Sequence, residues 1–80
     1  MTREEMLTSF TNQGIPPSMS WFGSIQSAEE VTGLSRNGEK WMVYYREHGS
    51  LFDVAMFDTE DAAIDEMHKR VSELFKMMKR

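Results

Sequence analysis

The chain has 80 residues, with 13 acidic side chains against nine basic ones and no cysteine, so its formal net charge is −4. This size predicts one domain, residues 1–80, and the acidity argues against nucleic-acid binding, which needs clustered Lys and Arg. The lack of cysteine excludes disulfides and thiolate metal sites, and the lack of a signal peptide or of ~20 consecutive apolar residues predicts a cytoplasmic protein without membrane partners.

The first predicted element is a short helix over residues 2–13. Thr2 and Glu5 form a capping-box pattern, in which each side chain accepts from the backbone N–H of the other residue. Gly14 and the prolines that follow it end the helix. The apolar residues at helical spacing, which predict the buried face, are Met6, Leu7 and Phe10.

Residues 15–27 have no regular pattern, because Pro, Ser and Gly separate the large apolar side chains. We expect a loop that folds back over the core, since a small domain needs its aromatic residues inside. The alternative is an exposed anchor at Trp21 and Phe22, because aromatic residues concentrate at interface hot spots.

Three strands and two hairpin turns follow. A strand over 31–36 leads into Asn37-Gly38, the dipeptide most typical of a type I′ turn. A strand over 39–46 and a turn at His48-Gly49 or Gly49-Ser50 precede the third strand, 51–57. The last two strands carry apolar groups on both faces. One face therefore meets helices, and the other needs a cover, either from the irregular segment before the strands or from another protein.

The second helix has the strongest pattern in the chain. It begins at Asp58 or Thr59, both good N-caps, and acidic residues in its first turn complement the helix dipole. Its apolar stripe consists of Ile64, Met67, Val71, Leu74, Phe75 and Met78. The predicted fold class is therefore α+β, a three-stranded antiparallel sheet packed with an N-terminal and a C-terminal helix.

No set of residues predicts catalysis. His48 and His68 lack neighbouring ligands at short spacing, so we expect no metal and no cofactor. Pairs of carboxylates such as Glu47 and Asp53 belong to solvated strand ends, where nothing separates their pKa values for acid–base work. We therefore expect a binding protein and not an enzyme.

Aromatic residues on neighbouring strand positions allow a second interpretation. Trp41, Tyr44 and Tyr45 would stack single-stranded bases if they formed an open sheet face. Acidic residues offset the basic ones along this hairpin, so nucleic-acid binding is only the alternative hypothesis. Packing in the core is the ordinary interpretation of Trp41 and Tyr45, with Tyr44 exposed.

One segment, residues 39–71, resembles small bacterial immunity proteins, which are encoded beside secreted polymorphic toxins and contact-dependent growth inhibition systems. The similar motifs are Trp41-x-Val43-Tyr44-Tyr45-x-Glu47-x-Gly49 and Phe57-Asp58-Thr59-Glu60-Asp61-Ala62. The resemblance implies an antidote that binds a cognate toxin domain, commonly a nuclease with a basic groove, and blocks it.

An acidic surface suits such a basic partner, because opposite potentials speed encounter and set register. We predict an interface at the strand ends, with Tyr44 as its aromatic anchor. The acidic residues predicted for this interface are Glu29, Glu30, Glu39, Glu47 and Asp53. Two simpler interpretations stay open: a generic interaction adaptor with another partner, or a charge that only keeps the domain soluble.

Overall fold

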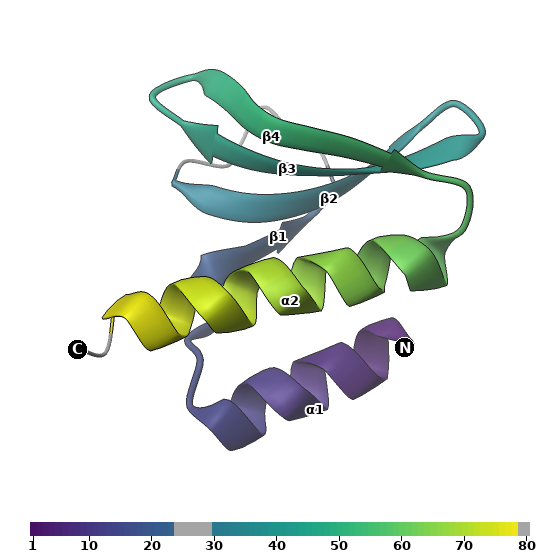
Figure 1. The fold of residues 1–80 in the computed structure, drawn as a ribbon. Coiled ribbons are helices and arrows are strands. Elements are labelled where there is room, and N and C mark those ends of the chain that lie inside the picture. The colour runs from purple at the N-terminus through teal and green to yellow at the C-terminus, as the bar shows by residue number, and fades with distance from the viewer. Residues whose placement is uncertain (24–29, 79–80) are drawn as a thin grey trace.

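The computed structural model describes residues 1–23 and 30–78. Its helices are α1 (Arg3–Gln13), the short 3-10 helix η1 (Pro17–Met19) and α2 (Glu60–Met78). Its strands are β1 (Ser20–Phe22), β2 (Val31–Asn37), β3 (Lys40–Glu47) and β4 (Ser50–Phe57), as Figure 1 shows.

The four strands form one sheet in the order β1-β2-β3-β4. β1 runs parallel to β2, while β2, β3 and β4 pair antiparallel. The predicted α+β class, with a helix at each end, is confirmed, but the prediction of three purely antiparallel strands is wrong. The additional strand has only three residues, too few for an alternating pattern, and lies in the segment that we expected to be a loop.

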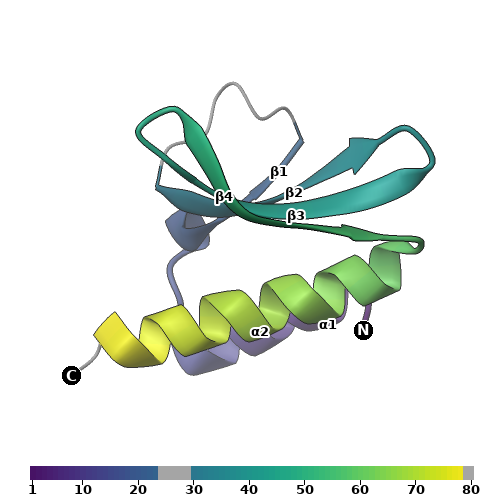
Figure 2. The same cartoon turned by 45° about the horizontal axis from the view of Figure 1, so that its top comes forward.

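Both helices lie on the same side of the sheet, which we call the helix face (Figures 1 and 2). α2 packs against β2, β3 and β4, and α1 packs against α2. The core between these layers consists of Met6, Phe10, Ile15, Leu34, Val43, Ala63, Ile64, Met67 and Val71. The apolar stripe of α2 is thus confirmed in its first three turns, whereas Met78 at its end is exposed.

The capping box of α1 is confirmed. The backbone N–H of Thr2 donates to Glu5 Oε1 over 2.8 Å, and that of Glu5 donates to Thr2 Oγ1 over 3.2 Å. The hydrogen bond from the Thr2 backbone to the Glu5 carboxylate, together with the Thr2 side chain, lowers the pKa of Glu5. The predicted apolar face is only partly right, because Met6 and Phe10 are buried while Leu7 is 42% exposed. Leu7 lies about 100° around the helix from Met6, beyond the reach of a narrow contact with α2.

The turn between β2 and β3 differs from the prediction by one residue. Asn37 pairs with Lys40, so Gly38 and Glu39 are the central residues. Gly38 has a φ of 65° and Glu39 has no positive φ, the pattern of a type II′ turn. This register places Leu34 opposite Val43, both in the core, and a slip of one residue would turn one of them away.

The β3–β4 turn has His48 and Gly49 at its centre, as one of the two predicted alternatives had it. Their φ angles are 50° and 79°, so both central residues have the positive φ of a type I′ turn. This tight connection keeps the ends of β3 and β4 together, with Glu47 opposite Ser50.

The centre of the other sheet face, which we call the far face, is buried around Tyr44. Tyr44 has 0% exposure, so the prediction of an exposed Tyr44 is wrong. Its partner across the strands is Gly33, and a Cβ built on Gly33 would lie 2.3 Å from Tyr44 Cζ. The ring therefore lies directly over the glycine backbone, a close approach that only glycine permits.

The Tyr44 hydroxyl is buried without a hydrogen-bond partner in the part of the chain that the structure describes. Burial also raises the pKa of Tyr44. Removing an unpaired buried hydroxyl leaves no partner unsatisfied, so Tyr44→Phe should change the free energy of unfolding by less than about 1 kcal/mol. Urea denaturation tests this, with Tyr44→Ala as the control that should cost about 3–5 kcal/mol. A large loss in Tyr44→Phe would show that the hydroxyl is bonded after all.

Candidate partner-binding site

β4 forms one edge of the sheet, because it pairs with β3 and ends the strand order. It has eight residues, whereas β1 at the other edge has three. An edge strand presents a row of backbone N–H and C=O groups that no neighbouring strand occupies. β4 is therefore the longer of the two edges at which another chain can pair with this sheet.

Half of the side chains of β4 are large, apolar and exposed. We call this set, Leu51, Phe52, Val54 and Met56, the edge patch. Phe52 is 50% exposed and Val54 is 48% exposed. Single exposed apolar residues are ordinary, but four of them on one edge strand favour a protein–protein contact.

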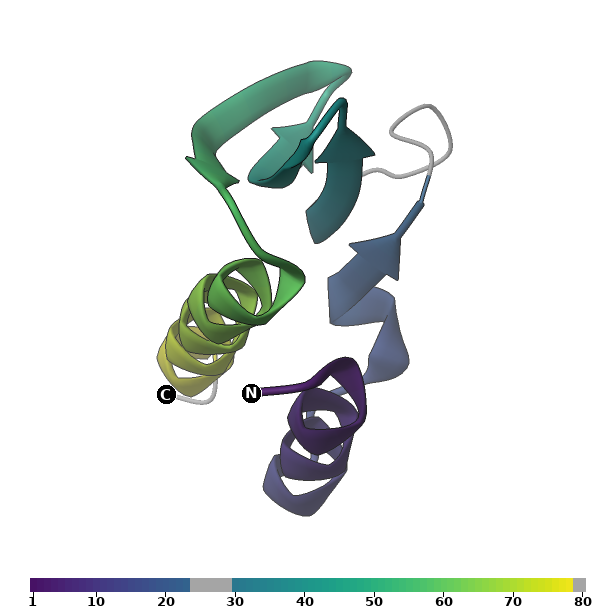
Figure 3. The same ribbon diagram turned by 90° about the vertical axis from the view of Figure 1, so that its right-hand side faces the viewer.

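β4 is irregular in its middle, at Asp53. Its pairing with β3 shifts register between Val43 and Tyr45, and Asp53 has a φ of 52°. Asp is one of the few residues that tolerate positive φ, and a bulge of this kind bends a strand and re-aims a side chain. The β3–β4 hairpin correspondingly curls at its tip (Figures 1 and 3).

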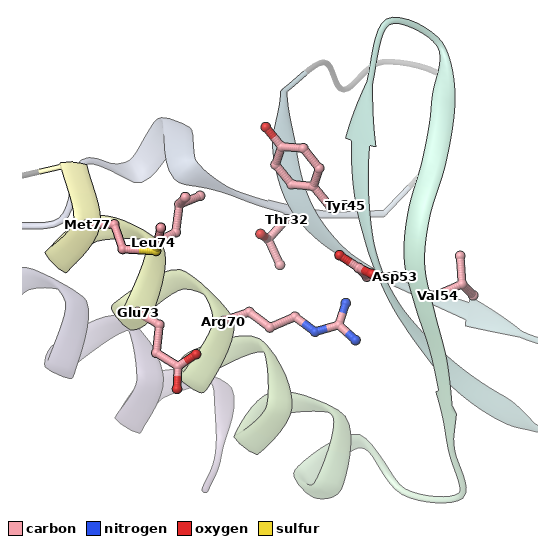
Figure 4. A pocket seen from close by; sticks show the side chains of 8 residues that line it. All are labelled: Thr32, Tyr45, Asp53, Val54, Arg70, Glu73, Leu74 and Met77. Carbon is pink, nitrogen blue, oxygen red and sulfur yellow. The ribbon is translucent and has the colours of Figure 1, made fainter.

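A groove with a volume of about 610 Å³ lies between the bent hairpin and the C-terminal half of α2. Its lining residues are Thr32, Tyr45, Asp53, Val54, Arg70, Glu73, Leu74 and Met77 (Figure 4). The aliphatic lining comes from both walls, Val54 on the strand and Leu74 and Met77 on the helix, and Met77 is 66% exposed. The groove thus continues the edge patch onto α2.

Arg70 lies within this groove and points toward Asp53 (Figure 4). Its Nε donates to Glu66 Oε2 over 2.6 Å, while its Nη1 is buried without a hydrogen-bond partner among the described residues. The ion pair with Glu66 runs along one helix at i,i+4. Among the described residues, no ion pair or hydrogen bond joins Arg70 to Asp53 on the opposite wall.

Acidic side chains line the groove at Asp53 and Glu73 and lie near Tyr45 at Glu30 and Glu47. We call Glu30, Glu47, Asp53 and Glu73 the acidic rim. Burial raises the pKa of Tyr45, and the negative charges of Glu47 and Glu30 raise it further, which places both carboxylates near this wall of the groove. The surface thus combines exposed apolar groups with nearby carboxylates.

The structure brings together only part of the predicted acidic interface. Glu30, Glu47 and Asp53 gather at one end of the sheet, but Glu39 lies in the β2–β3 turn at the other end. Glu39 and Glu47 are eight residue steps apart along extended chain, about 26 Å at 3.3 Å per residue. Glu39 therefore cannot share a compact site with Glu47, and Glu29 lies outside the described residues.

Tyr44 is not available as the aromatic anchor of this site, because its side chain is fully buried. Its neighbour Tyr45 is half-buried and lines the groove instead. Sequence reasoning also missed Arg70 and Glu73, which belong to a helix face that the apolar stripe alone does not single out. The sequence feature that pointed to this site was the presence of apolar residues on both faces of β4.

The aromatic residues do not form the open platform that the nucleic-acid hypothesis needs. Trp41 packs against the core on the helix face, and the guanidinium of Arg36 lies 5.1 Å from the centre of its ring. Tyr44 is buried on the far face, and Tyr45 lies in the groove. These three rings therefore offer no continuous stacking surface.

Across residues 1–23 and 30–78, no group of three or more His, Asp or Glu side chains is placed to hold a metal ion. His68 Nε2 is hydrogen-bonded to Ser9 Oγ over 2.8 Å, and its ring stacks on Phe10, so it joins α1 to α2. His48 is exposed in its turn. None of the described helices has the length and apolar character of a membrane span.

Comparisons with protein-family models, with curated proteins and with solved structures give no match to this chain. The resemblance to immunity proteins therefore stays a prediction, and the physical character of the surface must support any function.

Proposed function

We propose that this chain is a non-enzymatic immunity protein, which neutralises a basic toxin domain, such as a secreted nuclease, by binding it. The edge patch and the groove form the contact surface, and the acidic rim lies beside it. The observation that supports this proposal best is the coincidence of exposed apolar side chains and negative charge along β4 and the facing part of α2.

The apolar part of this surface would supply most of the binding energy. Burying apolar area contributes about 25 cal/mol per Å², and interface energy concentrates in a few large side chains near the centre. Phe52, Val54 and Met77 are the candidates, because each is about half exposed or more. A standard interface covers about 800 Å² per partner, roughly a sixth of the 5164 Å² that this chain exposes.

The acidic part would supply orientation and speed of encounter. Complementary charge raises association rates and excludes partners of the same sign. A toxin that binds nucleic acid needs a positive groove, since it must displace counterions from phosphates. An acidic rim is complementary to such a groove, and this agrees with the resemblance to immunity proteins.

The proposal predicts that a toxin domain is encoded immediately upstream, and co-expression with that domain tests it. We expect that the chain restores growth to cells that produce the toxin, and that the purified pair forms a stoichiometric complex in which the toxin is inactive. A toxin that stays fully active with an excess of this chain would contradict the proposal. Binding of a non-toxic protein through the same surface would favour the adaptor alternative.

Charge reversal should show that carboxylates of the acidic rim, and not those elsewhere on the surface, speed the association with the toxin. Glu47→Lys combined with Glu73→Lys should slow association with the toxin by about tenfold at low salt, with a smaller effect at high salt. The matched control is Glu39→Lys with Asp61→Lys, two exposed residues outside the rim that change the net charge equally. Stopped-flow or surface plasmon resonance measures both rates. Equal slowing in the two double variants would contradict the placement of the interface.

A further inference from the structure

We infer that the partner contributes an extended basic segment, which adds to the outer edge of β4 as a fifth strand and continues into the groove. This inference rests on the proposed function, because it specifies how the same surface binds.

The outer backbone groups of β4 are available to pair with an added strand. Within the described residues, its ladder partner is β3, and no hydrogen bond of a turn or loop involves its backbone. In a sheet, every second residue of an edge strand turns its N–H and C=O outward. An added strand satisfies these groups and places alternate side chains against the edge patch.

The bulge at Asp53 determines where the added segment changes direction. On one side of the bulge, Ala55 and Phe57 keep regular register with Val43 and Trp41. On the other side β4 bends, and Asp53 turns toward the groove (Figure 4). A segment paired with the regular part therefore reaches the groove at Asp53, where Val54 and Met77 provide apolar contact.

The charge of Asp53 determines which side chains the added segment needs. Asp53 is the one charged residue of β4, and Arg70 pairs with Glu66, not with Asp53, in the described residues. A lysine or arginine opposite Asp53 would gain the cross-strand attraction of an unlike pair. The segment is therefore one in which basic residues alternate with apolar or β-branched ones.

The same charge disfavours a second copy of this chain as the occupant. An antiparallel pair of two β4 strands with its centre between Asp53 and Val54 sets each Asp53 opposite Val54 of the other copy, so neither carboxylate gains a cation. Both copies also carry a net charge of −4, and this like charge opposes their association. Bulges and inward charges are devices by which edge strands avoid pairing with themselves.

The probe for the test is a blocked peptide of about ten residues in which lysine alternates with valine and threonine. We expect amide NMR shifts in Ser50–Phe57 and along the groove, and protection of alternate β4 amides from hydrogen exchange by about tenfold or more. Strand β1 should stay unchanged. A peptide of the same composition with a central proline, and one with glutamate in place of lysine, should not bind.

Asp53→Asn is the variant that isolates the charge, because Asn also tolerates a positive φ. It should weaken peptide binding about fivefold and leave the free energy of unfolding nearly unchanged. Equal affinity for the variant would overturn the basic chemistry of the segment. Shifts confined to other strands, or no shift at about 1 mM peptide, would overturn strand addition. Protection of β4 in a dimer of this chain alone would also overturn it.

The upstream toxin separates this inference from the proposed function. If the toxin is neutralised while the β4 amides of the complex exchange as fast as in the free chain, the proposed function stands and strand addition is wrong. If the peptide adds to β4 but no toxin is neutralised, strand addition stands and the proposed function is wrong.

Discussion

Gly33→Ala should destabilise this fold by about 3 kcal/mol, because overpacking of a filled core costs this much when the neighbour cannot move. The added Cβ would lie 2.3 Å from Tyr44 Cζ and 2.4 Å from its Oη. The ring has 0% exposure, so it has no open space into which it can retreat. A domain of 80 residues has a total stability of about 4–12 kcal/mol, so this change removes a large fraction.

Urea denaturation followed by tryptophan fluorescence measures this loss. Gly14→Ala is the control for backbone conformation, because Gly14 has a positive φ and no atom within 4 Å of its built Cβ. It should cost about 1 kcal/mol through strain alone. The double variant Gly33→Ala with Tyr44→Leu should lose less than the sum of the single variants, since the leucine vacates the space over residue 33. A Gly33→Ala protein with unchanged stability would contradict the described packing.

Phe10→Ala should cost about 3–5 kcal/mol, as truncation of a buried aromatic residue does. Phe10 is 4% exposed, and its ring lies parallel to that of His68 with 5.5 Å between the ring centres. The substitution removes a principal contact of α1 with α2. A helix of 11 residues is not stable alone. We therefore expect α1 to detach or the whole domain to unfold near room temperature.

Leu7→Ala is the matched control, because the same helix carries Leu7 on an exposed position. Its cost should stay within about 0.5 kcal/mol. Circular dichroism during urea denaturation compares the two variants. Similar losses in Leu7→Ala and Phe10→Ala would show that α1 docks through the broader face expected from the sequence, and not through the face that the structure buries.

Local patterns were sufficient for the elements that carry strong periodicity or caps. The capping box of α1, the apolar stripe of α2 and the alternation of the β-hairpins are all properties of neighbouring residues. β1 depends instead on a distant partner, since Ser20–Phe22 pairs with residues 32–34 of β2. The type of the β2–β3 turn also depends on residues outside the turn, because Leu34 pairs with Val43 in the core and so fixes the register.

The candidate site was predictable in its chemistry but only partly in its geometry. Acidic residues at strand ends were evident, yet an eight-residue strand places Glu39 and Glu47 at opposite ends. Tyr44 was misplaced because both faces of its strand are apolar, so alternation does not show which tyrosine is covered. The signal that sequence reasoning left unused was Gly33, since a glycine inside a strand often marks a close approach by a side chain.

Hydrogen exchange of this chain, free and bound to the toxin domain that the proposed function predicts, is the most direct test of binding through β4 and the groove. We predict slowed exchange in Ser50–Phe57 and in α2 around Arg70 and Glu73, with the Gly38-Glu39 turn unchanged. Protection confined to that turn and to the outer face of α1, with β4 exchanging at its free rate, would contradict the account.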